Sequence, residues 1–281
     1  MTTLDHKIDF AVILSVTNSN PNGDPLNGNR PRQNYDGHGE ISDVAIKRKI
    51  RNRLLDAGES VFVQSNDRKV DSYKSLKERA DANSELSKAV KAKDNEAFAQ
   101  AACKEWIDVR SFGQVFAFKG SDVSVGVRGP VTIHTATSID PIDITSMQIT
   151  KSVNSVTGDK KGSDTMGMKH RVDFGLYLFK GSINTQLAEK TGFTNNDADK
   201  IKQALITLFE NDASSARPDG SMEVHKVYWW EHKSKLGQYS SAKVHRLINI
   251  EPKQNDPKSF DDYEITLNEL DDLAVEVIDG Q

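Results

Sequence analysis

The alternation of apolar and polar positions first predicts a strand over residues 8–17, IDFAVILSVT. Its even-numbered positions are all apolar: Ile8, Phe10, Val12, Leu14 and Val16. Because successive side chains of a strand point to opposite faces, these residues share one face, and Ala11 and Ile13 make the other face apolar as well. We therefore expect a strand that is buried on both sides.

A helix with apolar residues at every fourth position follows over residues 43–58, DVAIKRKIRNRLLDAG. Ile46, Ile50 and Leu54 form its buried stripe, Ser42 is a suitable N-cap, and Gly58 ends the helix. Other segments have helical or strand patterns further along the chain. Helices are expected within 67–105, 182–192 and 194–213, and strands within 124–137, 170–180 and 221–233.

The order of these elements is β-α-β, a long loop, and β-α-β again. This order is typical of the ferredoxin-like (RRM-like) fold, an α+β architecture in which a four-stranded antiparallel sheet carries two helices on one face. The long loop, residues 138–169, has no clear period and contains glycines, lysines and three methionines. A stretch of this length without a period is typical of a functional or mobile segment.

Charge is distributed unevenly along the chain. The net charge is −4, but residues 251–281 contain ten acidic residues and only two lysines, so residues 1–250 are net positive. A mildly basic body is compatible with a polyanionic partner in spite of the negative net charge of the whole chain.

The same composition argues against several classes of protein. No run of about 18 apolar residues predicts a membrane span, and the N-terminus lacks the apolar core of a secretory signal. The single cysteine, Cys103, permits neither an internal disulfide nor a cysteine zinc site, and its neighbours predict a thiol packed on a helix face. We therefore expect a cytoplasmic location.

Residues 18–33, NSNPNGDPLNGNRPRQ, form an irregular segment rich in Asn, Gly and Pro. Asn18, Asn20 and Asn22 follow EF-hand spacing, but none of them is a carboxylate and Asn29 stands in place of the bidentate Glu, which argues against a calcium site. The alternative is a plain surface loop. That interpretation leaves unexplained why two arginines, Arg30 and Arg32, stand at its end, just before a basic helix.

The basic helix has five cations in seven positions, KRKIRNR, residues 47–53. At 100° per residue, Lys47 and Arg51 flank one side of the apolar stripe, Lys49 and Arg53 flank the other, and Arg48 points away. Such cations can simply be solvated residues whose stems cover apolar surface. Five cations without an intervening acid instead favour a polyanion, because clustered Lys and Arg neutralise phosphates well.

The methionines of the long loop, Met147, Met166 and Met168, leave two interpretations open, since methionine fills irregular apolar gaps. They anchor the loop to its own core, or they wedge against bases or a neighbouring subunit. The sequence lacks the aromatic signature of an RRM sheet face, and it lacks P-loop, GxSxG and HExxH motifs. His225 and His245 occur in strand-like contexts that favour ordinary structural roles.

Several segments are distinctive: NPNGDPLNGNRPR with GEISDVAIKRKIRNRLL, DVRSFGQVFA, VRGPVTIHTATSIDPI, HRVDFGLYLFKGSINTQLAEKTGFTNNDADKIKQAL and ASSARPDGSMEVHKVYWW. Together they resemble the backbone subunit of CRISPR Cascade complexes, the Cas7 family of the RAMP superfamily, in its type I-C branch. The resemblance covers about residues 8–232. It implies a single RNA-binding domain, residues 1–281, shaped like a hand: a ferredoxin-like palm, helical fingers inserted at 60–120 and a β-hairpin thumb at 138–169.

The resemblance also implies a function. Copies of the chain would assemble head to tail along a guide RNA (crRNA) and hold it, with other Cascade subunits, for pairing with target DNA in antiviral defence. The family's role implies no catalytic residue, no cofactor and no metal. On this resemblance the Asn/Gly/Pro loop and the basic helix approach RNA phosphates. The residues expected to bind RNA are Asn20, Asn22, Gly23, Arg30, Arg32, Lys47, Lys49, Arg51, Ser111, Phe112, Gln114, Lys151, Met166, Met168, Lys169, Arg171 and Arg217.

Two other functions stay open at this point. One is a metal- or histidine-dependent ribonuclease of the same superfamily, for which Asp24 and Asp36 are the loop candidates, although a turn role is the simpler interpretation of Asp24. The other is a generic RNA-binding module.

Overall fold

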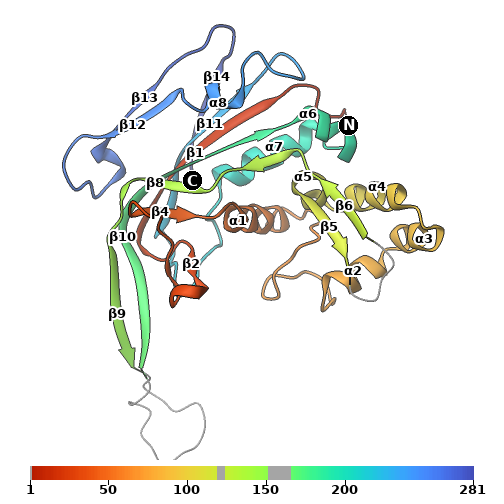
Figure 1. The fold of residues 1–281 in the computed structure, drawn as a ribbon, viewed down its shortest axis with the longest axis horizontal. Coiled ribbons are helices and arrows are strands. Elements are labelled where there is room, and N and C mark those ends of the chain that lie inside the picture. The colour runs from red at the N-terminus through yellow and green to blue at the C-terminus, as the bar shows by residue number, and fades with distance from the viewer. Residues whose placement is uncertain (1, 119–123, 151–165) are drawn as a thin grey trace, which may run out of the picture.

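One large antiparallel sheet organises the chain in the computed structural model, which describes residues 2–118, 124–150 and 166–281 (Figure 1). Its main path runs in the order β14 (Val275–Asp279), β11 (Met222–Glu231), β1 (Ile8–Ser19), β10 (Met166–Ile183), β8 (Ala136–Pro141) and β4 (His38–Ile41). Two further strands, β7 (Val131–Ile133) and β9 (Ile144–Thr150), also pair with β10. The predicted mixture of helices and antiparallel strands is confirmed, in a sheet larger than four strands.

β1 lies at the centre of the sheet, between β10 and β11, and both of its faces are buried as the alternation predicts. Val12 pairs with Phe179 on one side and with Val227 on the other. Its even-numbered residues belong to the core on one face, whereas Ala11 and Ile13 belong to the core on the opposite face.

Two helices, α1 (Asp43–Asp56) and α7 (Asn195–Ile206), pack on the first of these faces. Ser42 caps α1 by accepting a hydrogen bond from the Ala45 N–H, and the predicted stripe Ile46, Ile50 and Leu54 is buried. A capping box at Thr194 begins α7, which follows the short helix α6 (Thr185–Thr191).

The C-terminal segment covers the second face of the sheet, at the top of Figure 1. It contains α8 (Ser241–Val244), β12 (Ile248–Pro252), η3 (Phe260–Asp262) and β13 (Tyr263–Leu267), and its apolar side chains pack against Tyr228 and Trp230 of β11. His225 of β11 stacks on Phe260, with ring centroids 4.1 Å apart. The acidic segment is therefore a packed layer, and it leaves this sheet face unavailable for stacking with bases.

Residues within 62–118 and 124–127 form a second core beside the sheet. Four helices, α2 (Leu76–Ala82), α3 (Ser84–Ala92), α4 (Asn95–Glu105) and α5 (Ile107–Phe112), pack with a two-stranded ribbon of β5 (Gly113–Ala117) and β6 (Ser124–Arg128) around Phe62, Phe98, Trp106 and Phe116. The expected helices are present, but the insert is not purely helical. Cys103 is buried here, and this burial raises the pKa of its thiol to about 11, as fits a packed thiol.

A β-hairpin occupies much of the stretch without a period. β9 pairs with the first part of β10 from Ile144↔Val172 to Thr150↔Met166, and this ribbon projects from the body (Figure 1). The periodicity of these residues predicts no strand, because a ribbon exposed on both faces has no buried face to impose alternation; the β-hairpin was expected only from the family resemblance. In the described part of the chain, no helix is both long enough and apolar enough to cross a membrane.

Candidate nucleic-acid interface

The segment after β1 is held in shape by its own polar groups. β2 (Gly23–Asp24) pairs with β3 (Arg30–Pro31), with a short 3-10 turn, η1 (Pro25–Asn27), between them. Asn20 Nδ2 donates to the Asn29 carbonyl over 2.7 Å, and Asn22 Oδ1 accepts from the Ser42 N–H over 2.9 Å. Asn20 is buried and supports the shape of the loop, and its phosphate contact stays a prediction. Gly23 permits the tight turn, since a Cβ there would lie 2.0 Å from Asn29 Oδ1.

The loop residues considered for calcium binding and for ribonuclease chemistry make contacts within the protein. Asn20 and Asn22 use their side chains inside the protein, and no group of three or more His, Cys, Asp or Glu among the described residues is placed to hold a metal ion. Asp24 accepts a hydrogen bond from the Leu26 N–H and lies 3.6 Å from Arg32 Nη2, which is the turn role expected of it. In the turn after β3, the Asp36 N–H donates to Asn34 Oδ1.

The two arginines at the end of the loop connect it to the hairpin. Arg30 Nη1 donates to Ser146 Oγ of β9 over 2.8 Å, and His170 of β10 lies 2.8 Å from the same hydroxyl. Arg32 Nε is buried without a hydrogen-bond partner among the described residues. The fold thus brings the loop and the hairpin, which are more than 100 residues apart in sequence, to one place.

The cations of α1 do not form the free basic stripe that the sequence predicts. Lys47 pairs with Asp43 of its own helix at 3.0 Å. Arg51 Nε lies 2.9 Å from the buried Asp108 of α5, and Lys49 pairs with Asp212 beyond α7. The two flanking pairs lie on opposite sides of the apolar stripe as predicted, but Lys49 and Arg51 find their partners in distant segments that a helical wheel does not reveal. Arg53 likewise pairs with Asp56 and Glu210.

A cavity of about 300 Å³ opens between α1, the loop and two other segments. Four residues of α1 line it at the spacing i, i+3, i+4 and i+7, which places them on one helix face. The lining residues of the four walls are Ala45, Arg48, Lys49 and Asn52; Pro21, Asn22 and Gly23; Ser65, Asp67 and Arg68; and Asp212, Ala213, Ser214 and Arg217.

This cavity, which we call the α1 cavity, brings together Asn22, Gly23, Lys49 and Arg217 of the predicted set. Arg48, Asn52 and Arg68 line it too, and the sequence analysis did not select them. The signal that could have identified Arg48 and Asn52 is their i, i+4 spacing on the helix side opposite the apolar stripe.

The electrostatics of the α1 cavity are positive. Its charged lining consists of four cations and two acids. Burial lowers the pKa of Lys49 to about 8, although Asp212 acts in the opposite direction, and burial also lowers the pKa of Arg48. Asp212 accepts from Lys49 and from Arg217 Nε, the latter at 3.3 Å. Such a site favours small anions.

The predicted residues at the end of α5 have mostly structural roles. Ser111 is fully buried in the body of the protein, and its contact with RNA stays a prediction. Phe112 lies under Lys47 and Arg51, whose charged groups are 6.0 and 5.0 Å from its ring centroid. Gln114 Nε2 donates to the Val115 carbonyl at 3.0 Å.

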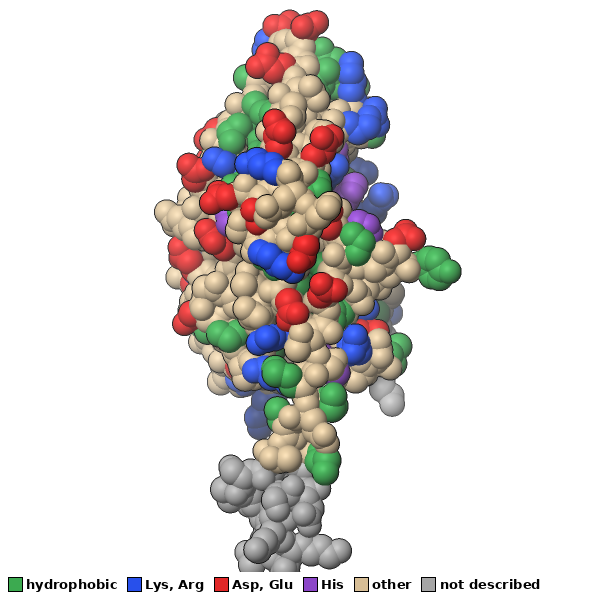
Figure 2. Space-filling view, turned by 90° about the vertical axis from the view of Figure 1, so that its left-hand side faces the viewer, with side chains coloured by type: hydrophobic (Ala, Val, Ile, Leu, Met, Phe, Trp, Pro, Cys, Tyr) green, Lys and Arg blue, Asp and Glu red, His purple; other side chains and the backbone are tan. Residues whose placement is uncertain are grey.

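The hairpin carries apolar side chains in solvent. Met166 and Met168 are 64% and 56% exposed, and Met147 and Ile149 are exposed as well, so these methionines do not anchor the hairpin to the core. Figure 2 shows hydrophobic side chains on this projecting ribbon, while acidic side chains gather higher on the same face.

The cations predicted for the hairpin differ in their surroundings. Lys169 is exposed, opposite Met147. Arg171 lies 3.3 Å from Asp173. Lys151 lies outside the described residues.

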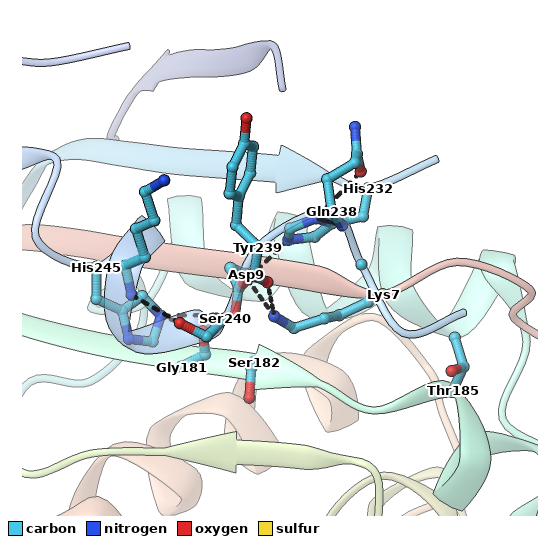
Figure 3. Close-up of polar contacts among 12 residues, drawn as sticks. Lys7, Asp9, Gly181, Ser182, Thr185, His232, Gln238, Tyr239, Ser240 and His245 are labelled. Carbon is cyan, nitrogen blue, oxygen red and sulfur yellow. Dashed lines mark hydrogen bonds and ion pairs between the residues drawn. The ribbon is translucent and has the colours of Figure 1, made fainter. Parts of the chain in front are cut away.

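A second polar cluster surrounds Asp9 of β1 (Figure 3). Asp9 lies 2.8 Å from His232 Nε2 and 2.9 Å from Lys7 Nζ, and His245 Nε2 donates to the Gly181 carbonyl over 3.0 Å. Burial raises the pKa of Asp9, but hydrogen bonds from His232, Ser241 and Lys7 outweigh it and hold the pKa below its usual value. Asp9 and His232 have no exposed side-chain surface. The cluster therefore ties strand ends together and offers no access to a substrate.

Comparisons with known proteins agree with this geometry. The model of the family described as "CRISPR-associated protein Cas7" matches residues 6–268. A protein of Haloferax volcanii described as "CRISPR-associated protein Cas7" is 25% identical over 232 residues, which are 76% of this chain and 67% of the relative. A chain of a "CRISPR RNA-guided surveillance complex, pre-nicking" has a similar fold, with a TM-score of 0.50, 15% identity, and coverage of 80% of this chain and 78% of that one.

Proposed function

The chain belongs to the family of CRISPR-associated Cas7 proteins, and we propose that it is a non-catalytic subunit that binds crRNA in a Cascade-like surveillance complex. The family match over residues 6–268 carries this proposal. The positive α1 cavity and the exposed apolar hairpin support it, because the first suits phosphates and the second suits bases.

The strand order supports the finer assignment of a ferredoxin-like palm. In the path β11-β1-β10-β8, β1 lies between β11 and β10, and β8 follows on the far side of β10. The helices α1 and α7 pack on one face of these strands, as in the ferredoxin-like fold. We assign the second core, within residues 60–120, to the fingers and the β9–β10 ribbon to the thumb. The distinctive segments between residues 8 and 232 favour the type I-C branch.

We further propose that several copies stack head to tail along the guide and present it for pairing with target DNA. A head-to-tail contact uses two different surfaces of each copy, so it generates an open filament. In this arrangement Met166 and Met168 of the thumb interrupt the stacking of guide bases, while Lys169 lies near phosphates.

Purification of the protein from cells that express its whole locus tests the proposal. Guide-length RNA with sequences from the repeat array is expected to co-purify, and the mass of the complex is expected to grow with the length of added guide RNA. Recovery of RNA unrelated to repeats favours a generic RNA-binding module. One copy per RNA at every length contradicts the backbone role.

The absence of catalysis needs a separate test. Repeat RNA and RNA complementary to the guide are incubated with the protein and Mg²⁺, and both are expected to stay intact. The engaged Asp24 and the inaccessible Asp9 cluster support this expectation. Cleavage that is lost in an Asp36→Asn variant would contradict it.

A further inference from the structure

The segment between β1 and β4 contains the only two Asn-Gly pairs of the sequence, Asn22-Gly23 and Asn27-Gly28. The backbone nitrogen that follows an asparagine can attack the carbon of its side-chain amide. Glycine permits this attack most readily, because it has no Cβ to shield its nitrogen or to restrict its backbone. The two pairs share this chemistry, so any difference in their reactivity comes from the fold.

Asn22 is held at both of its carbonyl groups. Its side-chain Oδ1 accepts from the Ser42 N–H over 2.9 Å, and its backbone carbonyl accepts from the Arg32 N–H over 3.1 Å. Gly23 belongs to β2 and has no free space beside it, since a Cβ there would lie 2.0 Å from Asn29 Oδ1. Ring closure at Asn22 requires rotation about its own backbone, which breaks these hydrogen bonds and displaces β2.

Asn27 has none of these restraints. It ends the short turn η1, in which no residue is buried, and Leu26 beside it is 96% exposed. In the described parts of the chain, no hydrogen bond holds the Asn27 side chain. Gly28 has a φ of +59°, and nothing lies within 4 Å of the position that a Cβ would take there. A short 3-10 turn at an exposed loop tip opens at little cost, so the Asn27 amide and the Gly28 nitrogen can meet.

We infer that Asn27 is a site of spontaneous deamidation, and that the fold protects Asn22 from the same reaction. The Gly28 nitrogen loses its proton and forms a bond to Asn27 Cγ, the bond from Cγ to Nδ2 breaks, and ammonia leaves with the proton. Water then opens the cyclic imide. Cleavage of the ring bond between nitrogen and Cγ gives aspartate, and cleavage of the ring bond between nitrogen and the main-chain carbonyl carbon gives isoaspartate.

The product changes the charge of the loop without breaking its anchoring contacts. Residues 18–33 contain two cations, Arg30 and Arg32, and one acid, Asp24, so a carboxylate at position 27 cancels the net positive charge of this segment. The Asn29 N–H closes the turn by donating to the Asp24 carbonyl over 2.8 Å, and this bond does not involve the modified residue. We therefore expect a folded, more acidic form of the protein that accumulates with time.

The test follows both asparagines in the full-length protein, incubated at mildly alkaline pH to favour loss of the nitrogen's proton. A protease that cleaves before aspartate separates the two sites at Asp24, and mass spectrometry measures conversion in each peptide. Asn27 is expected to convert at least about tenfold faster than Asn22, because closure at Asn22 breaks two hydrogen bonds. In guanidinium chloride, where the chain is unfolded, the two sites are expected to convert at similar rates.

Asn27→Gln is the matched variant, since it keeps the amide but closes the larger ring far more slowly. It is expected to abolish the new acidic form in ion-exchange chromatography while the circular dichroism spectrum stays unchanged. Equal rates at the two sites of the folded protein overturn the inference, as does an Asn27 that stays intact for as long as the unfolded chain needs to react. An acidic form that persists in Asn27→Gln also overturns it. The measurements involve no RNA, so their outcome is independent of the proposed function.

Discussion

Replacing Lys49 with methionine tests the electrostatics of the α1 cavity through the stability of the protein itself. The Lys49 side chain is 6% exposed, and its burial lowers its pKa from 10.5 to about 8 in spite of Asp212 beside it. Below pH 8 the lysine carries its proton in both the folded and the unfolded chain, so the folded state bears a penalty of about 3 kcal/mol from the shift. Methionine removes that penalty and retains much of the volume, while Asp212 keeps Arg217 as a partner.

The sign of the pH dependence follows from the same shift. Between pH 8 and 10.5 the folded lysine is neutral while the unfolded lysine is still charged, so the unfolded state binds more protons and stability rises with pH. The free energy of unfolding of the wild-type protein is therefore expected to rise by about 2 kcal/mol between pH 7 and pH 9.5 because of Lys49. Lys49→Met lacks this gain, so its advantage over the wild type shrinks by the same amount.

Urea unfolding at the two pH values measures this difference. Every other group that titrates in this range contributes equally to wild type and variant, and Lys47→Met on the same helix controls for the loss of a lysine. If the difference in free energy of unfolding between wild type and Lys49→Met is the same at pH 7 and pH 9.5, the reasoning is refuted, because burial then does not lower the pKa of Lys49.

Three further predictions concern the cavity, the hairpin and the second core. Asp212→Asn removes one of the two acids of the cavity and is expected to strengthen RNA binding several-fold and to steepen its salt dependence in anisotropy titrations; weaker binding would contradict this. Met166→Ala combined with Met168→Ala is expected to change the free energy of unfolding by less than about 0.5 kcal/mol, since both side chains are exposed. The double variant is also expected to alter the chemical reactivity of guide bases at regular intervals, and an unaltered pattern counts against methionines that interrupt base stacking. Gly129→Ala places a Cβ 2.3 Å from the Ser111 carbonyl oxygen and is expected to lose about 1–3 kcal/mol in thermal unfolding, whereas Gly126→Ala, which meets nothing within 4 Å, serves as the neutral control.

The elements that the sequence predicts best are those whose apolar periodicity shows how many of their faces are buried. β1 is apolar on both faces because helices pack on one side and the C-terminal layer on the other. α1 has one apolar stripe because it packs on one side, and Ser42 begins it as predicted. In both cases the apolar positions along the chain follow from which faces of the element are buried and which are exposed to solvent.

Other features depend on contacts between distant segments and leave no local pattern. The β9–β10 ribbon is exposed on both faces, so neither strand alternates. The acidic composition of residues 251–281 concealed a packed layer, because only a few apolar residues, such as Tyr263 and Leu273, pack against the sheet. The cluster of cations on α1 favoured a polyanion partner in the sequence, because two of their counter-ions, Asp108 and Asp212, come from elsewhere in the chain.

Asp108 shows how the second core determines the geometry of the α1 cavity. Its carboxylate is fully buried and accepts hydrogen bonds from the Phe62 N–H at 2.7 Å and the Val63 N–H at 3.0 Å, while Arg51 binds it at 2.9 Å. These bonds fix the backbone of Val63, whose carbonyl holds Arg48. The wall formed by residues 65–68 follows directly in sequence. The first residues of the insert therefore position the Arg48 guanidinium at the cavity. The second core thus contributes to this site through its backbone and not through the cations of its own helices.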